Sequence, residues 1–145
     1  MNAQTPVMVQ VRHRFTASAE RVFDAWLNPA TAGRWLFATP AGEMVRVQID
    51  ARVGGRYSIV ERRGGEEVEH AGEYLEMDRP RRLAFTFSVP AYSSAADRVT
   101  VDIAPLEHGC ELTLTHEMGA GMAEITGKAR DGWMGVLRGL EASLD

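Results

Sequence analysis

Two histidines are spaced so that their imidazole rings could lie inside an apolar interior. His70 shares the alternate positions of Val68 and Tyr74 in one predicted strand, and His116 shares those of Leu112 and Leu114 in another. Alternate residues of a strand face the same side of a sheet, so both rings are expected to point inward. There they could hydrogen-bond a carbonyl, carboxylate or hydroxyl group of a ligand. The alternative is that both are core residues, hydrogen-bonded to the backbone, Tyr57 or Tyr74.

If either histidine orients a ligand, its protonation should change the ligand affinity. An imidazole titrates near pH 6.5 unless its surroundings shift the pKa. Replacing His70 or His116 with Gln would keep hydrogen-bonding capacity and remove the titration. The pH profile of ligand affinity therefore distinguishes the two interpretations.

Aromatic and aliphatic residues recur at inward positions of the same predicted elements. Such side chains give a flat ligand a large contact area. Core packing alone also explains their spacing. With the two histidines, the predicted ligand-binding residues are Trp35, Tyr57, His70, Tyr74, Phe85, Phe87, His116, Trp133 and Leu137.

No residue pattern assigns a catalytic or metal-binding site. The four histidines have no partner one helical turn away, and the single cysteine, Cys110, excludes a paired-cysteine site. Glu61 and Glu73 are carboxylates with nothing in the sequence to distinguish them. There is no nucleophile elbow and no phosphate-binding glycine loop. We therefore expect no metal, no cofactor and no assigned catalytic residue, with Cys110 as a small apolar filler.

Hydrophobic periodicity predicts the elements that position these residues. Residues 7–15 alternate as a strand, Ser18 can cap a helix reaching Trp26, and Asn28-Pro29 can open a second short helix carrying Trp35 and Leu36. Six more strands are predicted over 45–49, 57–61, 67–77, 83–89, 99–103 and 110–116.

The last segment, 122–144, is predicted to be a long helix with one apolar stripe. The stripe residues recur at steps of three and four: Met122, Ile125, Ala129, Trp133, Val136, Leu137, Leu140 and Leu144. This order predicts an α+β fold in which a curved, seven-stranded antiparallel sheet wraps around the C-terminal helix, with an apolar hollow between them.

Four glycines interrupt that helix, namely Gly127, Gly132, Gly135 and Gly139. Each lowers helix propensity, so something should offset the cost. Gly132, Gly135 and Gly139 form a strip on one flank of the apolar stripe. Close packing of this strip against the short helices near Trp35 is one explanation; a ligand or the second subunit of a homodimer is another. Residues 127–135 are also expected to be the most mobile part of the fold and to act as a gate.

Composition limits the classes of function. The 145 residues fit one domain, 1–145, and the net charge of -4 argues against a nucleic-acid partner. No apolar run is long enough to span a membrane. The N-terminus lacks the features of a signal peptide, and with a single cysteine this predicts a cytoplasmic location.

Short strings in a fixed order give the chain a resemblance to a known family. They are residues 18–26, 34–35, 54–57, 72–76, 80–83, 112–117 and 132–133. In this respect the chain resembles the START-like, or Bet v-type, helix-grip (SRPBCC) superfamily, and in particular the branch similar to the C-terminal domain of the activator of heat-shock protein 90 ATPase. It departs from many relatives at Leu36-Phe37, where they carry a second tryptophan and a glycine-proline turn.

The resemblance implies three hypotheses of different classes. The first is a binding module that holds a hydrophobic small molecule between the sheet and the last helix. The second is a protein-interaction module that acts on a chaperone, for which the charge clusters 66–69 and 79–82 could form a docking rim. The third is a cyclase- or hydratase-type enzyme that uses a pocket histidine or carboxylate.

Overall fold

The strands form one antiparallel sheet in the computed structural model, which describes residues 7–39, 41–90, 96–118 and 126–144. Within these ranges the sheet has seven strands in the order β1-β7-β6-β5-β4-β3-β2. Their bounds are β1 Val7–Phe15, β2 Glu43–Ile49, β3 Arg56–Arg63, β4 Glu66–Asp78, β5 Arg82–Phe87, β6 Asp97–Pro105 and β7 Cys110–Met118.

Local capping fixes the two short helices that follow β1. In α1, Ala19–Ala25, the Ser18 side chain accepts a hydrogen bond from the Arg21 backbone N–H at 3.2 Å. In α2, Pro29–Ala32, the Asn28 side chain accepts from the Ala30 backbone N–H at 3.0 Å. The third helix, α3, spans Thr126–Leu144.

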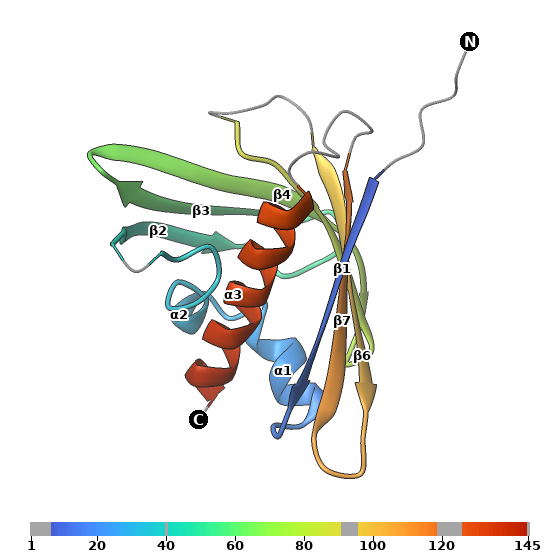
Figure 1. The fold of residues 1–145 in the computed structure, drawn as a ribbon. Coiled ribbons are helices and arrows are strands. Elements are labelled where there is room, and N and C mark those ends of the chain that lie inside the picture. The colour runs from blue at the N-terminus through green and yellow to red at the C-terminus, as the bar shows by residue number, and fades with distance from the viewer. Residues whose placement is uncertain (1–6, 40, 91–95, 119–125, 145) are drawn as a thin grey trace.

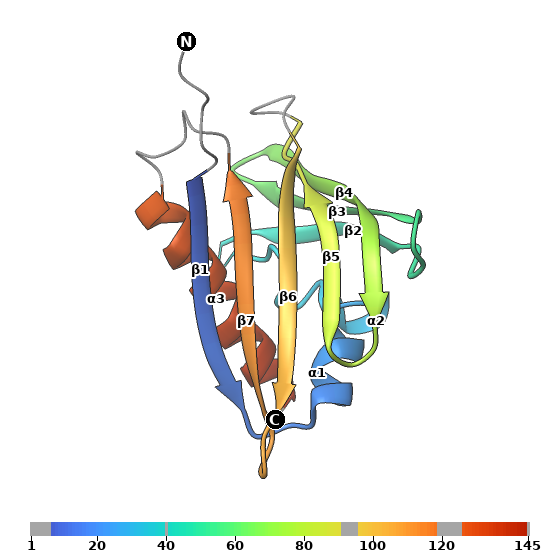
Figure 2. The same cartoon turned by 90° about the vertical axis from the view of Figure 1, so that its right-hand side faces the viewer.

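The long helix lies against the inner face of the curved sheet. Figure 1 shows α3 running past β1, with α1 and α2 at the same end of the molecule as the C-terminus. Figure 2 looks at the outer face, where α3 lies behind β1 and β7. Trp133, Leu137 and Leu140 form its buried side. The predicted α+β helix-grip fold is therefore confirmed, although Met122 and Ile125 of the predicted stripe lie outside the described residues.

The second short helix is shorter than predicted. It ends at Ala32, so Trp35 and Leu36 lie in the turns that follow it. Trp35, Leu36 and Phe37 are consecutive and all buried. Three consecutive helical residues would point in directions about 100° apart, so a continuous helix could not bury all three.

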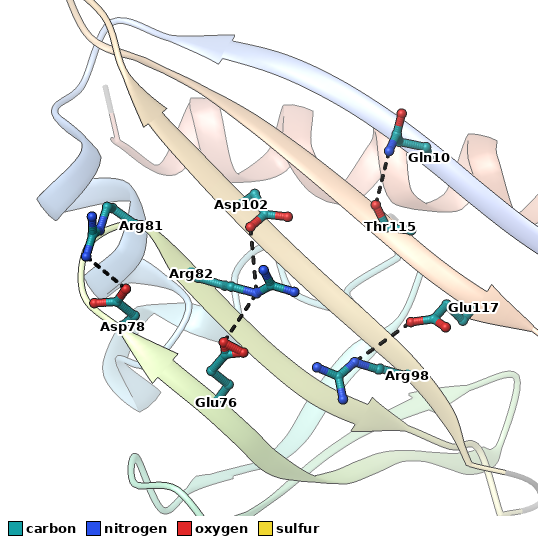
Figure 3. A network of polar contacts seen from close by, with 9 residues as sticks. All are labelled: Gln10, Glu76, Asp78, Arg81, Arg82, Arg98, Asp102, Thr115 and Glu117. Atoms are coloured by element: carbon teal, nitrogen blue, oxygen red, sulfur yellow. Dashed lines mark hydrogen bonds and ion pairs between the residues drawn. The ribbon is translucent and has the colours of Figure 1, made fainter.

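The outer face of the sheet carries polar side chains that pair across neighbouring strands (Figure 3). Arg82 of β5 lies 3.4 Å from Glu76 of β4 and 3.8 Å from Asp102 of β6. On the next strands, Arg98 lies 3.8 Å from Glu117. This face is thus solvated and internally paired, whereas the apolar side chains gather on the face that holds α3.

The glycines of α3 do not share one environment. A Cβ at position 139 would lie 3.1 Å from the Trp35 Cβ, so Gly139 packs closely against the segment after α2, as predicted. At Gly127, Gly132 and Gly135 a Cβ would meet nothing within 4 Å. These three therefore are not packing devices within the described chain, and their part in a gate stays a prediction.

Gly132→Ala is expected to raise the free energy of unfolding by about 0.5 to 1 kcal/mol, because alanine favours the helix and the position is open. Urea unfolding measures the change. Gly139→Ala is the matched control, because its methyl group would press on Trp35 and cancel the gain in helix propensity. Equal effects at the two positions would contradict this assignment of their surroundings.

Candidate functional site

The ring of Phe37 lies at the centre of an aromatic cluster between the sheet and α3. It stacks on His70 with ring centroids 4.5 Å apart and planes 5° from parallel. Phe87 lies 5.2 Å away at 25°, and the Trp133 ring meets it edge-on at 5.9 Å. The ring therefore occupies a slot with flat aromatic walls, contributed by β4, β5 and α3.

The backbone of Phe37 is held in an unfavourable conformation. Its φ of 60° lies in the left-handed region, which costs a bulky residue about 1 to 3 kcal/mol. The Arg63 Nη2 atom donates to the Phe37 carbonyl oxygen at 3.1 Å. This hydrogen bond and the burial of the ring offset the backbone cost.

Thr39, Glu61 and Arg63 form a polar cluster beside that segment, here called the latch. The Glu61 carboxylate, only 1% exposed, accepts from the Thr39 backbone N–H at 2.6 Å, from the Thr39 hydroxyl at 3.0 Å and from Arg63 Nε. Burial alone would raise the pKa of Glu61, but the hydrogen bonds from Arg63 and Thr39 outweigh it and lower the pKa. A Cβ at Gly42 would lie 2.2 Å from the Glu61 Cδ, so only glycine fits against this carboxylate.

His70 is a neutral imidazole inside the cluster. It is 6% exposed, and its Nδ1 atom has no hydrogen-bond partner among the described residues. Burial, followed by the nearby positive charge of Arg63, lowers the pKa of His70 to about 4. The expectation of a titration near pH 6.5 therefore does not apply to His70.

His116 is engaged at both ring nitrogens. The Trp133 indole N–H donates to His116 Nδ1 at 3.0 Å, and His116 Nε2 lies 2.9 Å from an Asp97 carboxylate oxygen. An indole N–H can only donate, so Nδ1 must accept and the proton of the neutral ring is on Nε2. The pair links α3 to β7 and β6. Both nitrogens of His116 are thus engaged without either predicted tyrosine, and Tyr57 donates to the Thr86 carbonyl oxygen at 2.8 Å.

The predicted hollow is largely filled by side chains. A polar pocket of about 190 Å³ lies where the end of β1 meets α1 and α3. Beside the Phe37 ring, what remains is an apolar cavity of about 10 Å³, room for roughly one water molecule. Its lining is Trp26, Leu36, Phe37, Tyr57, Tyr74, Leu83 and Phe85. The space is small because the aromatic side chain of Phe37 projects into it from the segment after α2. Two indole N–H groups of this region, Trp26 Nε1 and Trp35 Nε1, also have no partner within the described chain.

The structure brings most of the predicted ligand-binding residues into two adjoining groups. Tyr57, Tyr74 and Phe85 line the cavity. His70, His116, Phe87 and Trp133 surround or adjoin the Phe37 ring. Trp35 and Leu137 are buried in the same core, and Trp35 meets Trp26 edge-on at 5.0 Å. Ligand contact by any of the nine stays a prediction.

Sequence reasoning did not single out Phe37, Glu61 or Arg63. Glu61 shares its alternate positions with Tyr57 and Ile59, which is a signal that its carboxylate faces inward. Phe37 lies where the sequence departs from many relatives, at Leu36-Phe37. Arg63 lies two residues after Glu61 in the same strand and therefore on the same face, whereas nothing local in the sequence brings Thr39, 22 residues earlier, to this carboxylate.

The two charge clusters form ion pairs within the chain. Arg79 donates to both carboxylate oxygens of Asp24 at 2.8 Å, and the pair lowers the pKa of Asp24. Arg62 lies 3.5 Å from Glu67. These contacts favour the interpretation that the clusters are hairpin ends stabilised by ion pairs.

Three further features can be assessed within residues 7–39, 41–90, 96–118 and 126–144: metal binding, membrane-spanning helices and the cysteine. No group of three or more His, Cys, Asp or Glu side chains in these ranges could hold a metal ion. No helix there is long and apolar enough to cross a membrane. Cys110 is fully buried, and burial raises the pKa of its thiol.

Comparison with known proteins places the chain among related folds. The family model described as Activator of Hsp90 ATPase homolog 1-like protein matches residues 16–145. A crystal structure from Chromobacterium violaceum is 26% identical, with a TM-score of 0.82, covering 93% of this chain and 94% of that one. The solution structure of an AHSA1-like protein from Aeromonas hydrophila is 20% identical, with a TM-score of 0.81, covering 95% and 92%. A protein of unknown function from Staphylococcus aureus is 18% identical, with a TM-score of 0.79, covering 97% of each chain. No curated protein matches.

Proposed function

This chain belongs to the family described as Activator of Hsp90 ATPase homolog 1-like protein, and from that premise we propose that it binds a hydrophobic small molecule between its sheet and α3. The observation that carries the proposal is a set of unpartnered polar atoms in an apolar, aromatic-lined interior: His70 Nδ1, Trp26 Nε1 and Trp35 Nε1. Buried polar groups are normally hydrogen-bonded, and apolar pockets with a few polar groups are typical ligand sites.

Binding would be driven by the removal of apolar surface from water, at about 25 cal/mol per Å². The present cavity admits roughly one water molecule, so a ligand must displace a side chain. His70 supplies a neutral polar contact at physiological pH. The remaining predicted residues supply the apolar walls.

The other two hypotheses have less support. Several charges of the outer face and of the clusters at 66–69 and 79–82 form ion pairs within the chain, so these charges already have partners of opposite sign. The Glu61 carboxylate and both nitrogens of His116 are already engaged, so we propose no reaction at them. We propose a cytoplasmic location because a single cysteine cannot form an internal disulfide bond, as is usual for proteins of the reducing cytosol.

A titration with the neutral fluorescent probe N-phenyl-1-naphthylamine tests the proposal. The wild type is expected to bind it saturably, and Phe85→Trp or Leu137→Trp should weaken binding at least about tenfold, because each fills the interior further. Leu106→Trp is the matched control, since Leu106 is 42% exposed and lies in the turn between β6 and β7.

Near-ultraviolet circular dichroism would establish that each variant keeps its tertiary packing. Unchanged probe binding in well-folded Phe85→Trp and Leu137→Trp proteins would reject an internal binding site. Native mass spectrometry of the protein from its own cells would separately reveal a retained small molecule, a retained protein partner or a homodimer.

A further inference from the structure

We propose that Phe37 is an internal stand-in for the ligand, and that its slot takes a neutral arylalkyl carbonyl compound whose ring stacks on His70 and whose oxygen is bound by Arg63. The proposal rests on the proposed function and specifies its ligand class. Two groups of Phe37 make specific contacts: its ring stacks on His70, and its carbonyl oxygen accepts a hydrogen bond from Arg63. A ligand offering the same two groups at the same spacing would satisfy the same contacts.

The ring position is built for a flat aromatic group. His70 lies parallel to the Phe37 ring at 4.5 Å, Phe87 lies at 25° and Tyr57 at 19°, while Trp133 closes one side edge-on. Stacked and edge-on contacts of this kind require a planar partner. An aliphatic chain would fill the volume without reproducing them.

The oxygen position is equally well defined. Arg63 Nη2 donates to the Phe37 carbonyl oxygen at 3.1 Å, while Nε of the same guanidinium is fixed on the buried Glu61 carboxylate. Because the guanidinium is planar, fixing Nε also fixes the direction in which Nη2 donates. In phenylalanine this oxygen is separated from the ring by two carbons and the carbonyl carbon. The matching ligand therefore has a carbonyl group two carbons from an aromatic ring.

The charge balance favours a neutral oxygen. Glu61 already neutralises Arg63, so a ligand carboxylate would place a second negative charge beside the first. A ketone, ester or amide accepts from Nη2 without that repulsion. The ligand class is therefore a neutral carbonyl compound rather than an arylalkanoic acid.

Phe37 can leave its slot without disturbing the sheet. It lies in the segment between α2 and β2, and the next described residues, Ala38 and Thr39, are exposed. Its φ of 60° means that release relieves backbone strain. The ring also lines the cavity, so its departure joins the slot to that space and makes room for a slightly larger ligand.

The test compares 4-phenyl-2-butanone with butylbenzene, which has a similar size but no oxygen, by nuclear magnetic resonance titration of the wild-type protein. The ketone should bind at least about tenfold more tightly. It should also shift the guanidinium resonances of Arg63, a readout that leaves the latch unmutated. 3-Phenylpropanoate should bind more weakly than the ketone, and its tighter binding would overturn the neutral class.

Phe37→Ala removes the ring that competes for the slot but keeps the backbone carbonyl of residue 37, and it should raise the affinity of the ketone at least about tenfold over wild type. Phe23→Ala removes a buried ring that α1 contributes to the core, rather than the Phe37 ring, and controls for cavity formation; it should give no such gain. Equal affinity for ketone and hydrocarbon in the wild type, or no gain in Phe37→Ala, would overturn the proposal.

If N-phenyl-1-naphthylamine still binds in that case, internal binding survives and only this ligand assignment fails; if it does not, the proposed function fails as well.

Discussion

Acidification from pH 7 to pH 4 is expected to lower the free energy of unfolding by about 3 kcal/mol through His70 alone. Folding lowers the pKa of His70 from 6.5 to about 4, chiefly by burial. Between these values the unfolded chain binds a proton that the folded protein does not, so stability rises with pH across this window. The contribution is complete above pH 6.5 and is lost as the pH falls toward 4. The size follows from about 1.4 kcal/mol for each unit of pKa difference.

Urea unfolding of wild type and His70→Gln at pH values between 7 and 4.5 measures this effect. Glutamine does not titrate, so the variant should lose the part of the slope of unfolding free energy against pH that is due to His70. The other three histidines contribute equally to both proteins. The contribution of Glu61 belongs to a lower window, because folding lowers its pKa from 4.5 and the associated stability is lost only below that value. Parallel profiles for the two proteins would show that His70 is not held neutral by burial.

The strand and helix pattern could be predicted from sequence because it depends on local periodicity and capping. The inward direction of His70 and His116 followed from their place among alternating apolar residues, and both are buried. Ser18 and Asn28 cap the two short helices as their residue types indicate. These features need only the residues within one element.

The contents of the site could not be predicted because they depend on how separate elements meet. The Trp133–His116 hydrogen bond requires the docking position of α3 on β7, which no local pattern specifies. The ring of Phe37 enters the interior from the segment between α2 and β2 and takes up much of the space there. The sequence therefore indicated an apolar space between the sheet and α3, but not how small its volume is. Glu61 shares the alternate positions of Tyr57 and Ile59 in β3, but its partner Thr39 comes from 22 residues earlier in the chain, so the sequence assigned it no role.

Glu61→Gln is expected to destabilise the protein by about 2 kcal/mol and to loosen the segment that carries Phe37. The carboxylate accepts hydrogen bonds on both oxygens, from the Thr39 N–H on one and from the Thr39 hydroxyl and Arg63 Nε on the other. An amide has one acceptor oxygen, so in either orientation its NH₂ group faces a donor. At least one charge-assisted hydrogen bond is lost and the remaining donors repel.

Glu73→Gln is the matched control, because Glu73 lies on the neighbouring strand with its side chain 44% exposed and 3.9 Å from Arg56. That change should alter stability by no more than about 0.5 kcal/mol. Hydrogen exchange provides the local readout: the Thr39 amide should exchange about thirtyfold faster in Glu61→Gln, the factor that corresponds to about 2 kcal/mol, while the amides of β6 and β7 change only with global stability. If the Thr39 amide exchanges at the wild-type rate although urea unfolding shows the loss of stability, Glu61 stabilises the sheet rather than the segment that carries Phe37 and Thr39. Phe37 would then be held in its slot by the aromatic contacts alone.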